Sequence, residues 1–312
     1  MRQPGCAVQR LRQRSKLIPQ ALACWRWPTP FLSCTGPRIN WGLAASRPWR
    51  CDIVRSNFWT PDLFPMQLQN VLYSQGFGTR RVCAGLVQQG LVQVHDATVG
   101  GAPVPCTDAT QDFSTVGLRF RVQGVDWPYQ EKAYLMLHKP AGTECSQKPS
   151  TYPSIYTLLP SPLRMRPQKG AVQGVQAVGR LDQDTTGMLL LTDDGKFIHR
   201  MSSPRHHVPK VYEVSVKHPL DETQLRRLLE GVVLDDDPKP VRAAACEARG
   251  SHQLSLTLTE GKYHQVKRML AAVGNRVEGL HRSRIGGLAL PADLLPGQWR
   301  WLDADDLALI AG

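Results

Sequence analysis

A short polar segment between two apolar runs limits the folds open to this chain. The segment, residues 179–187, is GRLDQDTTG and follows Ala177 and Val178. A second apolar run, residues 188–191 (MLLL), comes directly after it. Apolar runs of this length predict buried strands, so an arginine, two carboxylates and two hydroxyls lie in a loop between strands. A carboxylate is costly to desolvate at such a place, which indicates binding or chemistry.

Two other interpretations of this loop are open from the segment alone. Arg180 and an aspartate could form a buried structural pair. Asp182, Asp184 and Thr186 also fit the D-x-D-x-T pattern of phosphatases that form an aspartyl-phosphate. That chemistry needs Mg²⁺ held by the second aspartate, and a doubly wound domain that begins near the motif. Here the motif lies in mid-chain, which disfavours the phosphatase interpretation.

Three further blocks accompany this loop in a fixed order. They are residues 137–142 (LHKPAG), 203–214 (SPRHHVPKVYEV) and 260–270 (EGKYHQVKRML). With residues 179–182 (GRLD), they resemble the motifs of the pseudouridine synthases that modify single ribosomal RNA positions. The resemblance runs from about residue 66 to residue 309. Residues 192–195 (TDDG) and 271–275 (AAVGN) are most similar to the small-subunit (16S) rRNA type within that family.

The resemblance implies which residues form the active site. Asp182 matches the catalytic aspartate, which acts as a nucleophile or as a base. Tyr212 matches the tyrosine that stacks on the uracil, and Lys267 matches the basic residue that pairs with the aspartate, where relatives often carry Arg. The reaction that the resemblance implies is the isomerisation of uridine to pseudouridine. It needs no metal, group donor or redox cofactor, so we expect none. The expected supports of the pocket are Leu181, Thr185, His264 and Gln265.

Basic residues near these motifs are candidates for RNA contacts. Arg180 precedes Asp182 by two positions, which predicts that both side chains lie on the same face of one strand. The resemblance implies that this arginine contacts phosphate near a flipped nucleotide. Arg205, His206 and His207 lead into the Tyr212 segment, and interleaved arginine and histidine suit phosphate contacts.

Residues 66–125 form the first predicted unit. Apolar residues at helical spacing predict two helices, the second capped by Thr79, and short strands follow. This order resembles the S4 RNA-binding domain. Arg80 and Arg81 begin the second helix, where side chains and backbone N–H groups can both meet phosphates.

Residues 126–312 form the second predicted unit, the catalytic domain. A linker is predicted near residues 122–132, and residues 148–175, rich in Pro, Gln and Gly, are predicted as a surface loop of low order. Predicted helices cover residues 196–201, 222–229 and 263–273, and predicted strands cover residues 133–137, 211–216 and 254–258. Helices that alternate irregularly with hairpin strands predict a mixed α+β fold built on a mainly antiparallel sheet.

Positive charge is concentrated at the start of the chain. The net charge is +12, and residues 1–65 contribute +8 of it, with ten Arg or Lys against Asp52 and Asp62. The remainder is mildly basic, so RNA contacts there depend on local patches. Five of the eight tryptophans also lie in residues 1–65. We interpret this segment as a disordered extension, either an over-long gene start before Met66 or a targeting segment.

The remaining expectations concern compartment and partners. No apolar run approaches the length of a membrane span, and no two cysteines form a C-x-x-C pair, so we expect a cytoplasmic protein with reduced thiols. The resemblance implies action on 16S rRNA in a small-subunit precursor particle, at uridine 516 in Escherichia coli numbering, after base flipping. We expect a monomer. The alternative is a non-catalytic S4-type RNA-binding or assembly factor, which the intact Asp182, Tyr212 and Lys267 disfavour.

Overall fold

The computed structural model describes residues 65–95, 102–168, 170, 172–203, 206–235 and 237–311. Residues 1–64 of the predicted N-terminal extension therefore lie outside the described residues. Within the described ranges, no helix combines the length and the apolar character needed to cross a membrane.

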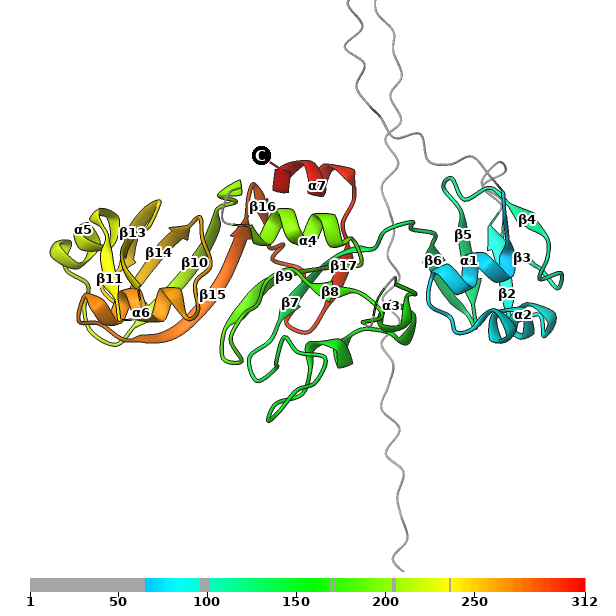
Figure 1. Cartoon of the computed structure of the whole chain (residues 1–312), viewed down its shortest axis with the longest axis horizontal. Coiled ribbons are helices and arrows are strands. Elements are labelled where there is room, and N and C mark those ends of the chain that lie inside the picture. The colour runs from blue at the N-terminus through cyan, green and yellow to red at the C-terminus, as the bar shows by residue number, and fades with distance from the viewer. Residues whose placement is uncertain are drawn as a thin grey trace, which may run out of the picture. The chain divides into compact units, whose positions relative to one another are not determined.

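Two helices and a small antiparallel sheet form the first part of the described chain (Figure 1). The elements are β1 (Met66–Gln67), α1 (Leu68–Ser74), α2 (Arg80–Gln88), β2 (Val92–His95), β3 (Val104–Pro105), β4 (Asp112–Phe113), β5 (Arg119–Val122) and β6 (Val125–Pro128). The sheet has the order β3-β2-β5-β6, and β1 pairs with β4. The cap predicted for the second helix is confirmed, because the Thr79 hydroxyl accepts the Val82 N–H.

Strand β6 occupies part of the predicted linker. The sequence predicts a linker near residues 122–132, but Val125–Pro128 pair with β5. The Trp127 ring is buried and packs edge-on against Phe77, with ring centroids 5.4 Å apart. This buried indole stabilises the segment as a strand of the small sheet. The small sheet therefore extends across the predicted boundary between residues 125 and 126.

The rest of the described chain builds a mixed sheet of nine strands, a separate two-stranded sheet of the eleventh and twelfth strands, and the helices around them. The elements are β7 (Tyr134–Lys139), η1 (Ile155–Leu158), α3 (Ser161–Met165), β8 (Gln176–Ala177), β9 (Thr186–Thr192), α4 (Gly195–Ser202), β10 (Lys210–Val216), α5 (Glu222–Glu230), β11 (Val232–Leu234), β12 (Asp237–Val241), β13 (Ala245–Gly250), β14 (Gln253–Leu258), α6 (Gln265–Ala272), β15 (Val277–Ile285), β16 (Leu288–Ala289), β17 (Trp299–Trp301) and α7 (Ala304–Ala311). The main order is β13-β14-β10-β15-β9-β7-β17, with β16 beside β15 and β8 beside β9. The predicted mixed α+β fold is confirmed.

The helices are divided between the two ends of this sheet (Figure 1). Helix α5 packs beside β13, and α6 packs beside β11 and β15, whereas α4 lies against β9 and α7 against β16. Strand β9 is buried on both faces, because Leu189 and Leu191 belong to one apolar cluster and Met188 and Leu190 to another. Burial on both faces explains why its sequence is a continuous apolar run and not an alternating one.

A short parallel contact joins the two halves of the sheet. Strands β9 and β15 pair only through Thr186 with His281 and Gly187 with Arg282. Gly187 has a φ of +107°, and a Cβ atom there would lie 2.3 Å from the Arg282 carbonyl oxygen. Only glycine permits this backbone conformation and this close approach. The polar loop identified in the sequence ends at this junction, since β9 begins at Thr186.

The expectation of a low-order loop over residues 148–175 is wrong in part. This stretch contains η1 and α3, and Ile155 and Leu163 are buried in the main apolar cluster. The Arg166 side chain is also buried and forms an ion pair with Asp193 at 2.6 Å. The prolines of this stretch delimit its short helices. The burial of apolar side chains such as Ile155 and Leu163 fixes these helices in place.

Candidate active site

The polar loop that precedes β9 is held by one buried lysine. Lys139, at the end of β7, is fully buried, and its ammonium donates hydrogen bonds to the carbonyl oxygens of Pro140, Gln183 and Thr185 at 3.1, 3.3 and 2.9 Å. Burial lowers the pKa of Lys139, while the nearby acidic groups, Asp184 and Asp182 among them, oppose that shift. A single side chain therefore fixes the loop backbone on both sides of Asp184, directly after Asp182.

The loop is not a strand, which corrects the predicted relation between Arg180 and Asp182. Strand β8 ends at Ala177 and β9 begins at Thr186, so both residues lie in irregular backbone. Gly179 has a φ of +73°, a conformation that turns the chain out of the strand. The strand period of two does not apply here, although Arg180 and Asp182 still line the same pocket.

Asp182 lies between two side chains from the segment that begins α6. Its carboxylate oxygens lie 3.1 Å from Lys267 Nζ and 3.2 Å from His264 Nε2. The Asp182 side chain is 28% exposed, so solvent and a ligand can reach it. The sequence prediction names all three residues, and the structure brings them together.

Lys267 also binds a second carboxylate that the sequence prediction did not place in the site. Its ammonium donates to both oxygens of Asp184, at 2.7 and 2.9 Å. Partial burial disfavours ionisation of Asp184, but the hydrogen bonds and charge of Lys267 outweigh it and lower the pKa of that carboxyl. Partial burial also opposes the Lys267 ammonium, but the hydrogen bonds to Asp184 and Asp182 raise the pKa of Lys267. Lys267 is thus a charged bridge between two carboxylates.

This bridge weighs against the phosphatase interpretation. An aspartyl-phosphate enzyme would use the space between Asp182 and Asp184 for Mg²⁺, and here the Lys267 ammonium occupies it. The sheet is also mainly antiparallel, whereas that chemistry needs a doubly wound domain.

The start of α6 has an unusual backbone conformation. His264, the N-cap of α6, is left-handed with a φ of +48°. A non-glycine residue rarely adopts this conformation, and such strain is concentrated at functional sites. Gln265 follows, buried, and its Oε1 accepts the Lys262 N–H at 2.8 Å. This backbone conformation and the Gln265 hydrogen bond orient the side chains of His264 and Lys267 toward Asp182.

The residues predicted around Asp182 line a small pocket of about 70 Å³. Those that the sequence singled out and the pocket contains are Arg180, Leu181, Asp182, Thr185, His264, Gln265 and Lys267. Tyr212 is not among the lining residues. It is buried in β10 opposite Arg282 and belongs to the same apolar cluster as Leu181.

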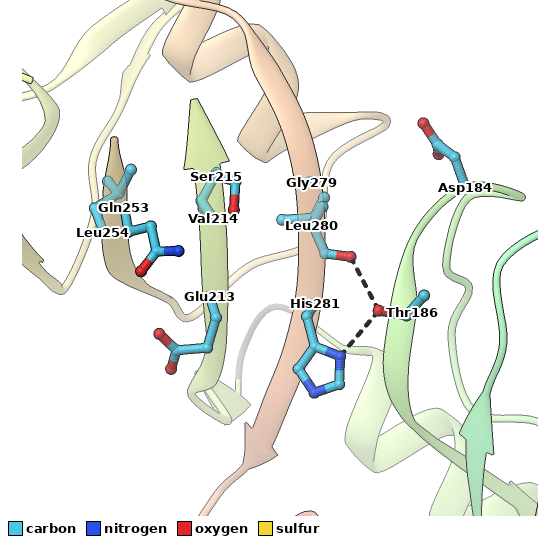
Figure 2. Close-up of a pocket in the computed structure, with 10 residues that line it drawn as sticks. All are labelled: Asp184, Thr186, Glu213, Val214, Ser215, Gln253, Leu254, Gly279, Leu280 and His281. Carbon is cyan, nitrogen blue, oxygen red and sulfur yellow. Dashed lines mark hydrogen bonds between the residues drawn. The ribbon is translucent and has the colours of Figure 1, made fainter. Parts of the chain in front are cut away.

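A larger groove of about 330 Å³ lies beside this pocket, on the junction between β9, β10 and β15 (Figure 2). Asp184 lies at its edge, and the Thr186 hydroxyl and His281 Nδ1 are 2.9 Å apart (Figure 2). Glu213 and Gln253 add polar groups from β10 and β14. The sequence prediction missed this groove. Alternation along β10 shows that Glu213 and Tyr212 point to opposite faces, but it does not show which strands lie beside β10 and complete the groove.

The predicted RNA-contacting residues have varied surroundings. Arg80 and Arg81 are exposed at the start of α2, where Arg80 donates to Asn70 Oδ1 and lies over the Tyr73 ring at 4.2 Å. His206 and His207 are exposed. Arg205 lies outside the described residues.

Comparison with known proteins identifies the family. The sequence pattern described as RNA pseudouridylate synthase matches residues 133–272. The ribosomal small subunit pseudouridine synthase A of Haemophilus influenzae is 35% identical to this chain over 229 residues, which cover 73% of this chain and 92% of that relative. The chain belongs to the RNA pseudouridine synthase family. The protein of the same name from Escherichia coli is 42% identical over 177 residues, 57% of this chain and 73% of that relative.

A solved pseudouridylate synthase structure agrees with this assignment. It is 32% identical to this chain with a TM-score of 0.53, and the match covers 78% of this chain and all but 1% of the other. In this pseudouridine synthase the family pattern begins at the strand that ends in Lys139 and extends through α6. It therefore contains every residue that lines the Asp182 pocket except Leu280.

Replacing Lys139 by Met is expected to impair this pseudouridine synthase without removing any group that lines the pocket. Loss of the three hydrogen bonds should lower the free energy of unfolding by about 1–3 kcal/mol. The loosened loop should slow pseudouridine formation about 10- to 100-fold, because small displacements of a reacting group are costly. Urea unfolding and single-turnover assays measure the two effects.

The control is Lys132→Met, at an exposed residue that precedes β7, and this variant should resemble wild type. Wild-type stability and rate in Lys139→Met would contradict this role.

Proposed function

We propose that this pseudouridine synthase isomerises one uridine of 16S rRNA, at the position of uridine 516 in Escherichia coli numbering. The observation that carries the proposal is the Asp182 carboxylate, which is reachable from solvent and held by Lys267 and His264 where the two halves of the sheet meet. The substrate class comes from the relatives, which are named ribosomal small subunit pseudouridine synthase A.

The reaction breaks the C1′–N1 glycosidic bond, turns the uracil and joins C1′ to C5. The C5 proton leaves and N1 is protonated, so the atoms balance without a further reactant. Asp182 assists either by attacking C1′ as a nucleophile or by removing a sugar proton as a base, and a carboxylate is suited to both. Lys267 and His264 hold its two oxygens in place for either route.

Other residues are proposed to position the substrate. The exposed Arg180 lines the pocket, and its guanidinium is proposed to contact a phosphate of the flipped nucleotide. Tyr212 is proposed to stack on the uracil. This role requires the Tyr212 ring to be uncovered from the apolar cluster that it shares with Leu181.

The remaining parts are proposed to bind the surrounding RNA. Residues 66–125 are assigned to an S4-like module that contacts phosphates through Arg80 and Arg81, and residues 126–312 to the catalytic domain. Arg205, His206 and His207 are assigned to the rim of the catalytic domain. The proposed substrate is a small-subunit precursor particle, bound by a monomer in the cytoplasm.

The test is a map of pseudouridine in ribosomal RNA from cells with and without this gene. Loss of one 16S pseudouridine, restored by the wild-type gene, is the expected result. Loss of a large-subunit pseudouridine would keep the chemistry but contradict the substrate. An unchanged map would contradict the proposed activity in favour of a non-catalytic assembly factor.

A further inference from the structure

One exposed aromatic ring stands out beside the catalytic pocket. Tyr263 is 75% exposed, more than any other large apolar side chain in the part of the chain that the structure describes. Its ring is stacked on His264, with centroids 3.8 Å apart and an interplanar angle of 20°. One face of the Tyr263 ring is therefore covered by imidazole, and the side chain is otherwise open to solvent.

The stack is fixed relative to the reacting group. His264 Nε2 lies 3.2 Å from the Asp182 carboxylate, so Tyr263 is separated from the catalytic aspartate by a single imidazole ring. The Tyr263 carbonyl oxygen accepts a hydrogen bond from Arg268 Nη1 at 3.2 Å, which ties its backbone to the first turn of α6. The left-handed conformation of His264 completes this geometry.

A ring held in this way suits a nucleobase. Aromatic side chains bind unpaired bases by stacking, and every base offers a face. Extrusion of the target uridine removes a stacking partner from its neighbours in the RNA. Basic side chains around the same pocket, Arg180 and Lys262 among them, attract the phosphates that accompany such a base, although Glu260 also lies there.

We propose that Tyr263, backed by His264, forms a stacking platform for the nucleobase adjacent to the flipped uridine. The platform replaces stacking that the base loses when the uridine leaves the RNA helix. This inference rests on the proposed function, because it assigns the RNA chemistry at the rim of the same pocket.

The first test measures stacking without requiring catalysis. RNA fragments of 16S rRNA carry 2-aminopurine on the 5′ or the 3′ side of the target uridine, and the fluorescence is recorded with wild type, Tyr263→Phe and Tyr263→Leu. At one of the two positions the base should stay quenched with wild type and Tyr263→Phe, and it should brighten with Tyr263→Leu. Tyr263→Leu should also bind the fragment about tenfold more weakly, within the range known for loss of one base–aromatic stack. The control is Tyr152→Leu at another exposed tyrosine, which should match wild type.

The second test uses turnover. Tyr263→Leu should lower kcat/KM about tenfold on intact RNA and have no further effect on RNA that is abasic at the identified position. Equal fluorescence for wild type and Tyr263→Leu at both positions would overturn the platform, as would an equal loss on intact and abasic RNA. If wild type forms no pseudouridine, the proposed function fails, and the fluorescence measurement still decides whether the platform exists.

Discussion

Asp182→Asn is expected to abolish pseudouridine formation, with a fall in single-turnover rate of about 10⁴-fold or more. The amide has the shape of the carboxylate but is a poor nucleophile and a poor base, so either chemical route fails. Both neighbours of Asp182, Lys267 and His264, remain in the variant, and the fold should be kept. The measurement is tritium release from RNA labelled at uridine C5, together with RNA affinity, which should change little.

The matched control is Asp184→Asn. Asp184 lies on the same loop and binds the same Lys267, but its side chain is about half exposed. Without Asp184, Lys267 still has Asp182 as a partner, so the rate should fall less than about tenfold. If Asp184→Asn abolished turnover and Asp182→Asn retained it, the catalytic assignment would pass to Asp184.

The sequence motifs predicted the members of this site better than its contacts. Asp182 comes from one motif and Lys267 and His264 from another, and the structure brings their side chains together. Motif matching gives residue identities, but it does not show that Lys267 lies closer to Asp184 than to Asp182. That detail depends on the path of the loop, which the buried Lys139 determines through backbone carbonyls.

The error about Arg180 has a similar physical origin. Alternation of side chains holds only where backbone pairing keeps the strand extended. Here Gly179 turns the chain, and the loop carbonyls of Gln183 and Thr185 bind Lys139 instead of a neighbouring strand. The buried strand after the loop, β9, was predicted correctly because its own apolar run decides its burial. The strand before the loop, β8, is only half-buried and ends before Val178. The loop between them depends on a contact with β7, which no local pattern encodes.

Residues 148–175 illustrate the limit of composition. Pro, Gln and Gly predict a surface loop of low order, yet the described residues of the segment form η1 and α3 and are held by side chains from outside it. The Glu144 carboxylate accepts the N–H groups of Ser150, Thr151 and Tyr152. Arg166 is buried because its partner, Asp193, lies just after β9. An arginine in a proline-rich stretch gives no local sign of such a partner, so its importance for stability appears only in the structure.

Arg166→Met is accordingly expected to be strongly destabilising. The Arg166 guanidinium donates to Asp193 Oδ2 at 2.6 Å and to the carbonyls of Gln130 and Glu131 at 2.7 and 3.1 Å, with only 2% of the side chain exposed. Methionine fills similar volume but leaves the buried Asp193 carboxylate without its cation, at a cost of about 3–5 kcal/mol.

The urea midpoint measures this cost, and a second substitution identifies its cause. The midpoint of Arg166→Met should fall by about 1–5 M for a slope of 1–3 kcal/mol per molar. Asp193→Asn added to Arg166→Met should restore part of the loss, because it removes the uncompensated charge while the amide oxygen can still accept the Ala133 N–H. The control is Arg226→Met, since Arg226 and Glu230 form an exposed pair at 3.8 Å, and its effect should stay within about 0.5 kcal/mol. Equal destabilisation by Arg166→Met and Arg226→Met would show that the buried pair contributes no more than a surface one.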